Sequence, residues 1–167
     1  MRRWVLALVG AVVAALVTVV VMRMWKSDDD LIKESIGRFT KAVGVKEGDN
    51  PISRTARIKS ELAETVEADV HVSVEELGVE VSGRKDLAAE ATRVGMFYQR
   101  AKADVVRVSI KREPSALVAS ADATVRVVGE RGGAAREDLR EIHFLMVKSE
   151  GRWLIRSMDV RAATQAQ

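Results

Sequence analysis

The chain has 167 residues, a formal net charge of +3 and no cysteine. The lack of cysteine excludes disulfides, thiolate nucleophiles and zinc sites built on cysteine. All 24 acidic residues follow residue 27, and only four of the 27 basic residues precede it, so the remainder carries 23 basic against 24 acidic residues. This near-neutral part of the chain lacks the excess of positive charge that is typical of nucleic-acid-binding domains.

A long apolar run opens the chain. The 19 residues from Trp4 to Met22 carry no charge. As an α-helix they would extend about 28 Å, close to the thickness of a hydrocarbon core. Such a helix has no polar face, and in lipid it satisfies its own backbone hydrogen bonds. The run therefore predicts a transmembrane helix, which is bordered by Arg2, Arg3, Arg23, Trp25 and Lys26.

The residues after this run favour an uncleaved anchor over a cleaved secretory signal. The sequence VVVMRMWKSDDD has bulky and charged residues where a signal peptidase needs small ones. A slight excess of positive charge on the leading side favours an amino terminus on the inside. We expect residues 1–27 to anchor the chain in a bacterial inner membrane. Residues 28–163 would then form an extracytoplasmic, periplasmic domain, followed by a polar tail at 164–167.

Small residues form a stripe on the predicted span. Ala7, Ala11 and Ala15 recur at four-residue spacing, and small side chains let two helices approach closely in lipid. Alanine is also common in spans that make no such contact. The stripe is a candidate interface, and both explanations stay open.

Helical periodicity follows the anchor. A first helix is predicted to begin at a cap formed by the aspartates 28–30 and to end at Gly44, and we interpret these aspartates as a cap rather than a metal site. Its buried stripe is Ile32, Ile36, Phe39 and Val43. A second helix is expected to be capped by Ser53, and its buried stripe is Ile58, Leu62 and Val66.

The remaining patterns predict a hairpin, a third helix and four strands. The segment 69–83 alternates valines with polar residues around Gly78, as a hairpin does. Helical spacing returns in 84–101 through Leu87, Ala91, Val94 and Tyr98. Strand-like alternation follows in 104–111, where the inward set is Val106, Val108 and Ile110, and in 116–130, 139–148 and 153–162. RGGAAR at 131–136 is expected to be a flexible hairpin loop. The fold class is therefore α+β, with three helices packed on a curved, mainly antiparallel sheet.

This order resembles the nuclear transport factor 2-like superfamily, which includes SnoaL-like polyketide cyclases and ketosteroid isomerases. The resemblance covers residues 28–163 and is carried by DLIKESIGRFTKAV, VSGRKDLAAEATRV and REIHFLMVKSEGRWLIRSMDV, with the pattern Gly151-x-Trp153-x-Ile155. It implies a cone around an apolar pocket and frequent dimerisation through the sheet.

No catalytic constellation is visible in the sequence. The first predicted helix has no tyrosine, Asp122 shares a strand face with Ser120 and Thr124, and no Gly-x-Ser-x-Gly elbow is present. Two isolated histidines do not make a zinc site, so we expect no metal, no cofactor and no assigned catalytic residue. Candidates for lining a pocket, with core packing as the default role, are Phe39, Phe97, Tyr98, His143 and Trp153.

The strand IHFLMV is apolar on both faces. When helices cover one face of a sheet, the other face is expected to be exposed to solvent and polar. An apolar second face therefore implies that something packs against it as a second cover. A second copy of the domain, or a partner protein, would supply this cover through Leu145 and Val147.

Two functions follow from these patterns. The first is a non-catalytic, membrane-anchored scaffold or protein-interaction module, an architecture that also resembles periplasmic scaffold components of secretion systems and accessory proteins of lipid importers. The second is a pocket enzyme or a binder of a small apolar ligand, which has only the fold resemblance in its favour. Regulation of a neighbouring membrane enzyme is a third alternative.

Overall fold

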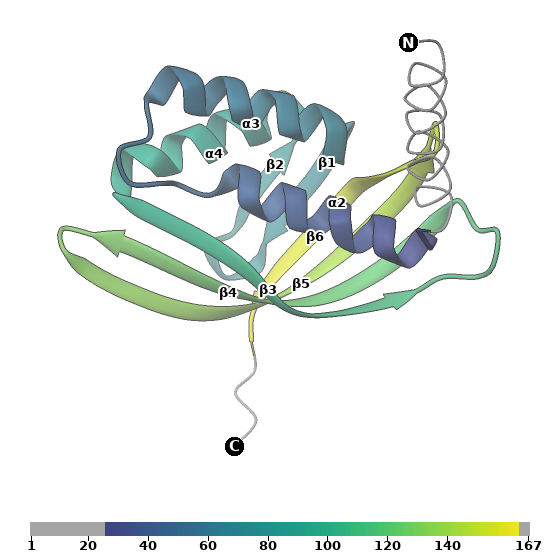
Figure 1. Ribbon diagram of the computed structural model, residues 1–167. Helices are drawn as coiled ribbons and strands as arrows, with labels where there is room; N and C mark the ends of the chain where they lie inside the picture. The colour runs from purple at the N-terminus through teal and green to yellow at the C-terminus, as the bar shows by residue number, and fades with distance from the viewer. Residues whose placement is uncertain (1–25, 164–167) are drawn as a thin grey trace, which may run out of the picture.

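The computed structural model describes residues 26–163, which form three helices on one six-stranded sheet. The strand order is β2-β1-β6-β5-β4-β3; β1 and β6 are parallel and all other neighbours are antiparallel. Figure 1 shows α2 crossing the concave side of the curved sheet, with α3 and α4 beyond it. The predicted α+β architecture is confirmed. In chain order the elements are α2 (Asp28–Val43), α3 (Pro51–Thr65), β1 (Val66–Val74), the 3-10 turn η1 (Glu75–Leu77), β2 (Val79–Ser82), α4 (Arg84–Phe97), β3 (Arg100–Lys111), β4 (Val118–Arg131), β5 (Ala134–Ser149) and β6 (Arg152–Ala162).

The predicted transmembrane helix and the polar tail lie outside the described residues. Within 26–163, no helix combines the length and the apolar character that a membrane crossing needs.

The N-cap of α2 lies one residue before the predicted cap. Ser27 is the N-cap: its hydroxyl accepts a hydrogen bond from the Asp30 backbone N–H at 3.2 Å, and the Asp30 carboxylate accepts one from the Ser27 N–H at 3.3 Å. This reciprocal arrangement is a capping box. The aspartates 28–30 therefore fill the first turn, where negative charge is favourable, and Ser27 takes the capping role that was predicted for them.

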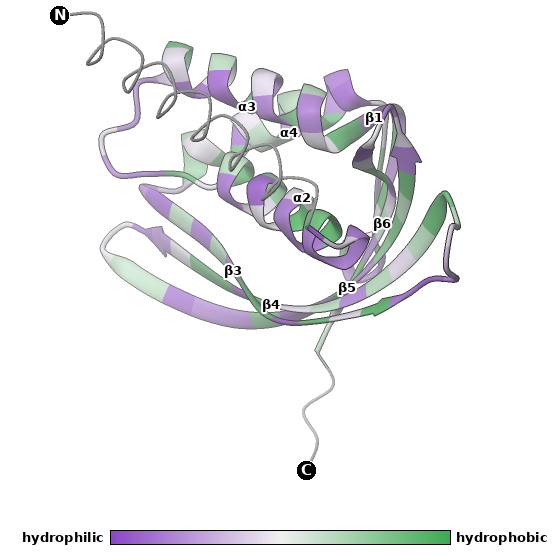
Figure 2. Ribbon diagram, turned by 45° about the vertical axis from the view of Figure 1, so that its right-hand side comes forward, coloured by the Kyte–Doolittle hydropathy of each residue, from purple (hydrophilic) through white to green (hydrophobic). Residues whose placement is uncertain are grey.

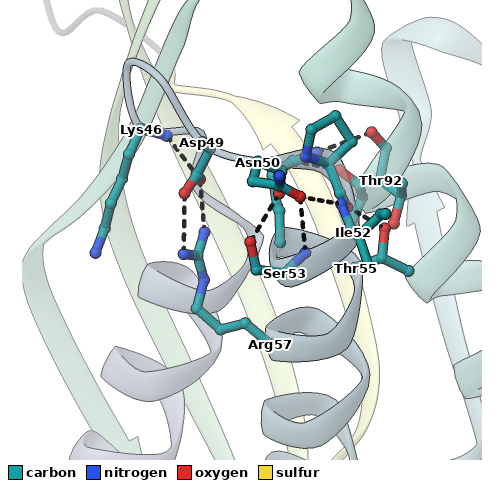
Figure 3. Close-up of polar contacts among 11 residues, drawn as sticks. Lys46, Asp49, Asn50, Ile52, Ser53, Thr55, Arg57 and Thr92 are labelled. Atoms are coloured by element: carbon teal, nitrogen blue, oxygen red, sulfur yellow. Dashed lines mark hydrogen bonds and ion pairs between the residues drawn. The ribbon is translucent and has the colours of Figure 1, made fainter.

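Helix α3 also starts from a different cap. The Asn50 side chain accepts hydrogen bonds from the N–H groups of Ile52 and Ser53, and Pro51 occupies the first helical position (Figure 3). Proline suits this position because its missing N–H would have no helical partner. The predicted cap at Ser53 is therefore wrong by three residues. Val66, assigned to the helix from its spacing, is the first residue of β1.

The hairpin between β4 and β5 is tighter than expected. Only Gly132 and Gly133 separate the strands, with φ values of 60° and 79°. Two consecutive residues with positive φ match the twist of the flanking strands, and glycine adopts them without steric cost. RGGAAR is thus a two-residue turn with strand residues on either side, and the predicted flexible loop is wrong.

A bulge in β3 corrects the predicted inward set of that strand. The pairing with β4 shifts register between Val105 and Arg107. The extra residue turns Val106 outward, where it is exposed, while Val105 packs against the core. Figure 2 shows hydrophilic and hydrophobic bands alternating along β3, and the bulge moves this alternation by one position.

The core fills the concave side of the sheet. Ile32, Ile36 and Phe39 of α2 belong to one cluster with Phe144 and Met146 of β5, all of them buried. The predicted stripe of α2 is confirmed at these three positions. Helix α2 lies against β3 and β6, while α3 and α4 lie against the β1 end of the sheet.

Candidate functional site

The main cleft lies between α2 and the edge strand β3. It has a volume of about 870 Å³ and is also bordered by the α2–α3 loop and by the exposed side of α3. Its floor is apolar and consists of Ala42, Val45, Ala101, Ala103 and Val105. An apolar floor of this kind is typical of a binding site.

Gly44 shapes one end of this cleft. After α2 ends, Val45 forms an isolated antiparallel bridge with Ala101. The Val45 N–H donates to the Ala101 carbonyl at 2.7 Å, and the Val45 carbonyl accepts a bond from the Ala101 N–H at 3.0 Å. A Cβ on Gly44 would lie 3.2 Å from the Ala101 carbonyl oxygen and 3.3 Å from that of Lys41. The loop therefore reaches the strand edge because residue 44 has no side chain.

The rim of the cleft is basic. Six basic residues line it, against three acidic ones: Arg38, Lys41, Lys46, Arg57, Arg100 and Lys102 against Glu47, Glu61 and Asp104. The difference is three positive charges on a domain that is otherwise near neutral. Such a concentration favours an anionic ligand.

Ion pairs occupy part of this rim. Arg38 pairs with Glu61 at 2.8 Å and Arg100 with Glu47 at 2.6 Å. Lys41 and Lys46 make no ion pair with any residue of the described region. These two ammonium groups are the ones available to a ligand.

Asp49 and Arg57 hold the loop that carries Lys46. The Arg57 guanidinium donates two hydrogen bonds to the Asp49 carboxylate, at 2.7 and 3.2 Å, and these bonds hold the pKa of Asp49 below its usual value. The Asp49 carboxylate also accepts the Lys46 backbone N–H at 3.2 Å. Figure 3 shows the Lys46 side chain extending away from this pair, so its ammonium group is not used in holding the loop.

A second, polar hollow of about 450 Å³ lies on the opposite, outer face of the sheet. Ser109, Asp122, His143 and Asp159 face one another there across β3, β4, β5 and β6. His143 Nδ1 lies 2.6 Å from Asp122 Oδ1, and this hydrogen bond lowers the pKa of Asp122.

The side chains of Asp122 and His143 are both about half exposed. Water therefore screens the pair, and the site lacks the apolar surroundings that raise a carboxyl pKa for proton transfer. Among the described residues no group of three or more potential ligands could hold a metal.

None of the five pocket candidates from the sequence lines the main cleft. Phe39 and Trp153 belong to the core, and the Trp153 indole N–H donates to Asp28 at 3.0 Å. Phe97 and Tyr98 lie exposed at the end of α4, where the Tyr98 ring rests on Gly129. His143 lies on the outer face of the sheet, where it lines the second hollow.

The interface candidates lie in two regions. Leu145 is half buried on β5, and Val147 is only 5% exposed within a single chain. Val147 therefore has little solvent-accessible surface that a second copy of the chain could contact. Ala7, Ala11 and Ala15 lie outside the described residues.

The main cleft has no local signature in the sequence. Its basic residues come from α2, the following loop, α3 and β3, so no local motif unites them. The available signals were Gly44 directly after a helix and the alternation of small and charged residues in RAKAD. Neither signal shows which elements face one another.

No family model matches the sequence, and no curated protein matches it. Solved structures do match. A Novosphingobium aromaticivorans protein, provisionally named a scytalone dehydratase, has a TM-score of 0.62 at 13% identity over 88% of this chain and 87% of that one. A Xanthomonas campestris protein, provisionally named a calcium/calmodulin dependent protein kinase II association domain, has a TM-score of 0.64 at 9% identity over 84% and 91%.

A third match names the fold. A nuclear transport factor 2-like protein with a cystatin-like fold, also from Novosphingobium aromaticivorans, has a TM-score of 0.61 at 13% identity over 92% of this chain and 90% of that one. Identities this low establish a fold and no function. Residues 26–163 therefore have the nuclear transport factor 2-like, cystatin-like fold.

Proposed function

We propose that this chain is a non-catalytic protein-interaction module that its leading segment tethers to a membrane. One observation carries the proposal: the concave side of the sheet, where the fold would hold a reaction centre, is filled with hydrophobic side chains. Phe144, Met146 and Ile155 are fully buried there, and Trp153 is 2% exposed. These side chains fill the central part of the interior, and the main cleft lies beside them at the edge strand β3.

The polar groups in the interior also favour binding over chemistry. In the part of the chain that the structure describes, the buried polar side chains are Ser35, Thr40, Arg54 and Thr65, and no carboxylate is buried with them. Proton-transfer enzymes of this architecture use a carboxyl group whose pKa is raised by apolar burial. A pocket enzyme, the other function that the fold resemblance allows, therefore has less support.

An exposed apolar surface gives the proposed module a place for a partner. We define the α4-end patch as Ile52, Val94, Met96, Phe97 and Tyr98. Ile52 is 81% exposed, Met96 78% and Phe97 53%. Large apolar side chains that gather on a surface mark interaction sites.

Arg54 holds the two parts of the α4-end patch together. Arg54 as a residue is 4% exposed, and its guanidinium donates to the carbonyls of Ala91 and Thr92, at 2.6 and 2.8 Å, so α3 is tied to the last turn of α4. The patch is thus presented on a rigid support and can bind with little loss of conformational entropy.

The outer face of the sheet supports a second contact, with another copy of the chain. Leu145 lies on this face between Ser120 and Ser157, its neighbours on the adjacent strands. A face that carries an apolar residue within a polar row fits the central part of a two-fold interface. We propose a homodimer through this face, or a membrane-complex partner on it.

The membrane location is part of the same proposal. The support is the uncharged run from Trp4 to Met22, long enough to cross a bilayer as a helix. A tether at residue 27 would place the domain beside the inner membrane, on the extracytoplasmic side that the flanking charges favour.

Photo-crosslinking of the full chain in its native membrane tests the proposal. Benzoylphenylalanine at Met96 should give a protein adduct, because the α4-end patch contacts a partner. The same group at Lys59, which is exposed on α3 outside the patch, is the matched control and should give none. A chain that gives no adduct at Met96 and turns over a small molecule would contradict the proposal.

A further inference from the structure

The free edge of β3 runs along the main cleft. β3 is the last strand of the sheet, and beyond β4 its only pairing in the described chain is the single bridge between Val45 and Ala101. Both backbone groups of Ala101 bond to Val45, so they point away from β4. Because backbone groups alternate in direction along a strand, those of Ala103 and Val105 point to the same free edge.

These free backbone groups coincide with the apolar floor and the basic rim. Ala103 and Val105 both line the cleft, and Lys41 and Lys46, the two ammonium groups without an ion pair in the described region, lie on its rim. Val45 already shows that an extended segment fits against this edge. The cleft continues from Val45 to the bulge at Val105 and Arg107, where the regular edge ends.

We propose that this cleft binds a short, extended, acidic peptide segment of a partner protein, which adds to β3 as a strand. This inference rests on the proposed function, because it specifies one kind of partner for the interaction module. The peptide backbone would continue the line of Val45 and pair with Ala103 and Val105. Its apolar side chains would lie on the floor, and its carboxylates would face Lys41 and Lys46. Strand addition of this kind takes affinity from the backbone and specificity from alternate side chains.

A small amphipathic anion is the competing occupant. It would use the floor and the two lysines and would leave the backbone of β3 unpaired. An edge with free donors and acceptors is a template for another strand, and this favours the peptide.

The first test measures charge complementarity. The probe is a displayed library of octapeptides with glutamate at alternate positions and apolar residues at the others, selected on the full chain in detergent micelles. The enriched peptides should bind the Lys41→Glu/Lys46→Glu variant at least about tenfold more weakly. The matched control is Lys33→Glu/Lys59→Glu, which makes the same charge change at exposed positions outside the cleft and should stay within about twofold. Failure to enrich any peptide, or equal loss in both variants, would overturn the inference.

The second test distinguishes strand addition from simple charge attraction. Two versions of an enriched peptide are N-methylated at odd or at even positions, and fluorescence anisotropy measures their affinities. Only one version should lose binding, because a strand edge takes hydrogen bonds from alternate residues. Equal binding of both versions, together with displacement by oleate, would assign the cleft to the small anion instead.

Failure of this inference is distinguishable from failure of the proposed function. The adduct at Met96 does not depend on the cleft, since the α4-end patch shares no residue with it. An adduct at Met96 without peptide binding would remove the peptide site and leave the interaction module standing. If neither the adduct nor peptide binding were observed, both the peptide site and the interaction module would be ruled out.

Discussion

At the scale of single residues, Asp28 connects the start of α2 to the sheet. One oxygen of its carboxylate accepts hydrogen bonds from Lys148 at 2.7 Å and from the Trp153 indole at 3.0 Å. We expect Asp28→Asn to lower the free energy of unfolding by about 1–3 kcal/mol, because both bonds involve the charged form. Asp29→Asn is the control: its carboxylate is half exposed, and its pair with Arg112 should cost about 0.5 kcal/mol. Thermal unfolding followed by near-UV circular dichroism measures both effects, and equal losses would contradict the assignment.

The same carboxylate predicts a pH dependence. The hydrogen bonds from Lys148 and Trp153 lower the pKa of Asp28 in the folded chain. A lowered pKa adds stability above the unfolded value, about pH 4 for aspartate, and this stability is lost as the pH falls through the lowered pKa. The unfolding temperature should therefore fall more steeply on acidification in the wild type than in Asp28→Asn. Parallel pH profiles would show that Asp28 contributes nothing to this dependence.

Gly95 and Gly37 are both helical but should respond oppositely to alanine. A Cβ on Gly95 would lie 2.8 Å from the Arg54 guanidinium carbon, whereas one on Gly37 would meet nothing within 4 Å. Gly95→Ala should lower the free energy of unfolding by about 1–3 kcal/mol, because it displaces a buried arginine. Gly37→Ala should raise it by about 0.5–1 kcal/mol through better helix propensity. Chemical denaturation curves of the two variants give both signs, and a stable Gly95→Ala would show that Arg54 moves freely.

At the scale of elements, the bulge decides which valine of β3 supports the core. Val105 packs against the core, and Val106 is exposed. We expect Val105→Ala to lower the free energy of unfolding by about 1 kcal/mol, and Val106→Ala to change it by less than about 0.5 kcal/mol. Denaturant titration measures the difference. If Val106→Ala lowered the free energy of unfolding more than Val105→Ala, the inward set predicted from the sequence would hold and the bulge would lie elsewhere.

At the scale of the whole molecule, the outer sheet face predicts a homodimer that one charge would disrupt. Leu145→Glu places a charged carboxylate in the middle of the proposed two-fold interface, and burying a charge there costs free energy. Light scattering of the full chain in detergent should show the protein mass fall by half. Leu77→Glu, at a more exposed leucine in η1, is the control and should leave the mass unchanged. If the wild-type chain were already monomeric in this measurement, the proposed homodimer would be contradicted.

Much of the fold could be predicted from periodicity alone. The positions Ile32, Ile36 and Phe39 repeat with the period of a helix and are buried as predicted. Ala119, Ala121 and Ala123 repeat with the period of a strand and are also buried. Caps and bulges were less predictable: the Ser27 and Asn50 caps depend on a few local hydrogen bonds, and the outward position of Val106 depends on one extra residue. Such local choices have weak signals in a sequence without a structure.

The amino-acid sequence by itself determined the apolar leading run, the absence of cysteine chemistry and the α+β class. Each of these depends on composition or on a period within one segment. The tertiary structure alone decided that the concave side is filled and that a basic cleft borders the edge of β3. Arg100 and Glu47, which pair at this rim, are 53 residues apart. A pattern within one element shows which of its faces is buried, whereas the contents of a cleft depend on how distant elements pack together.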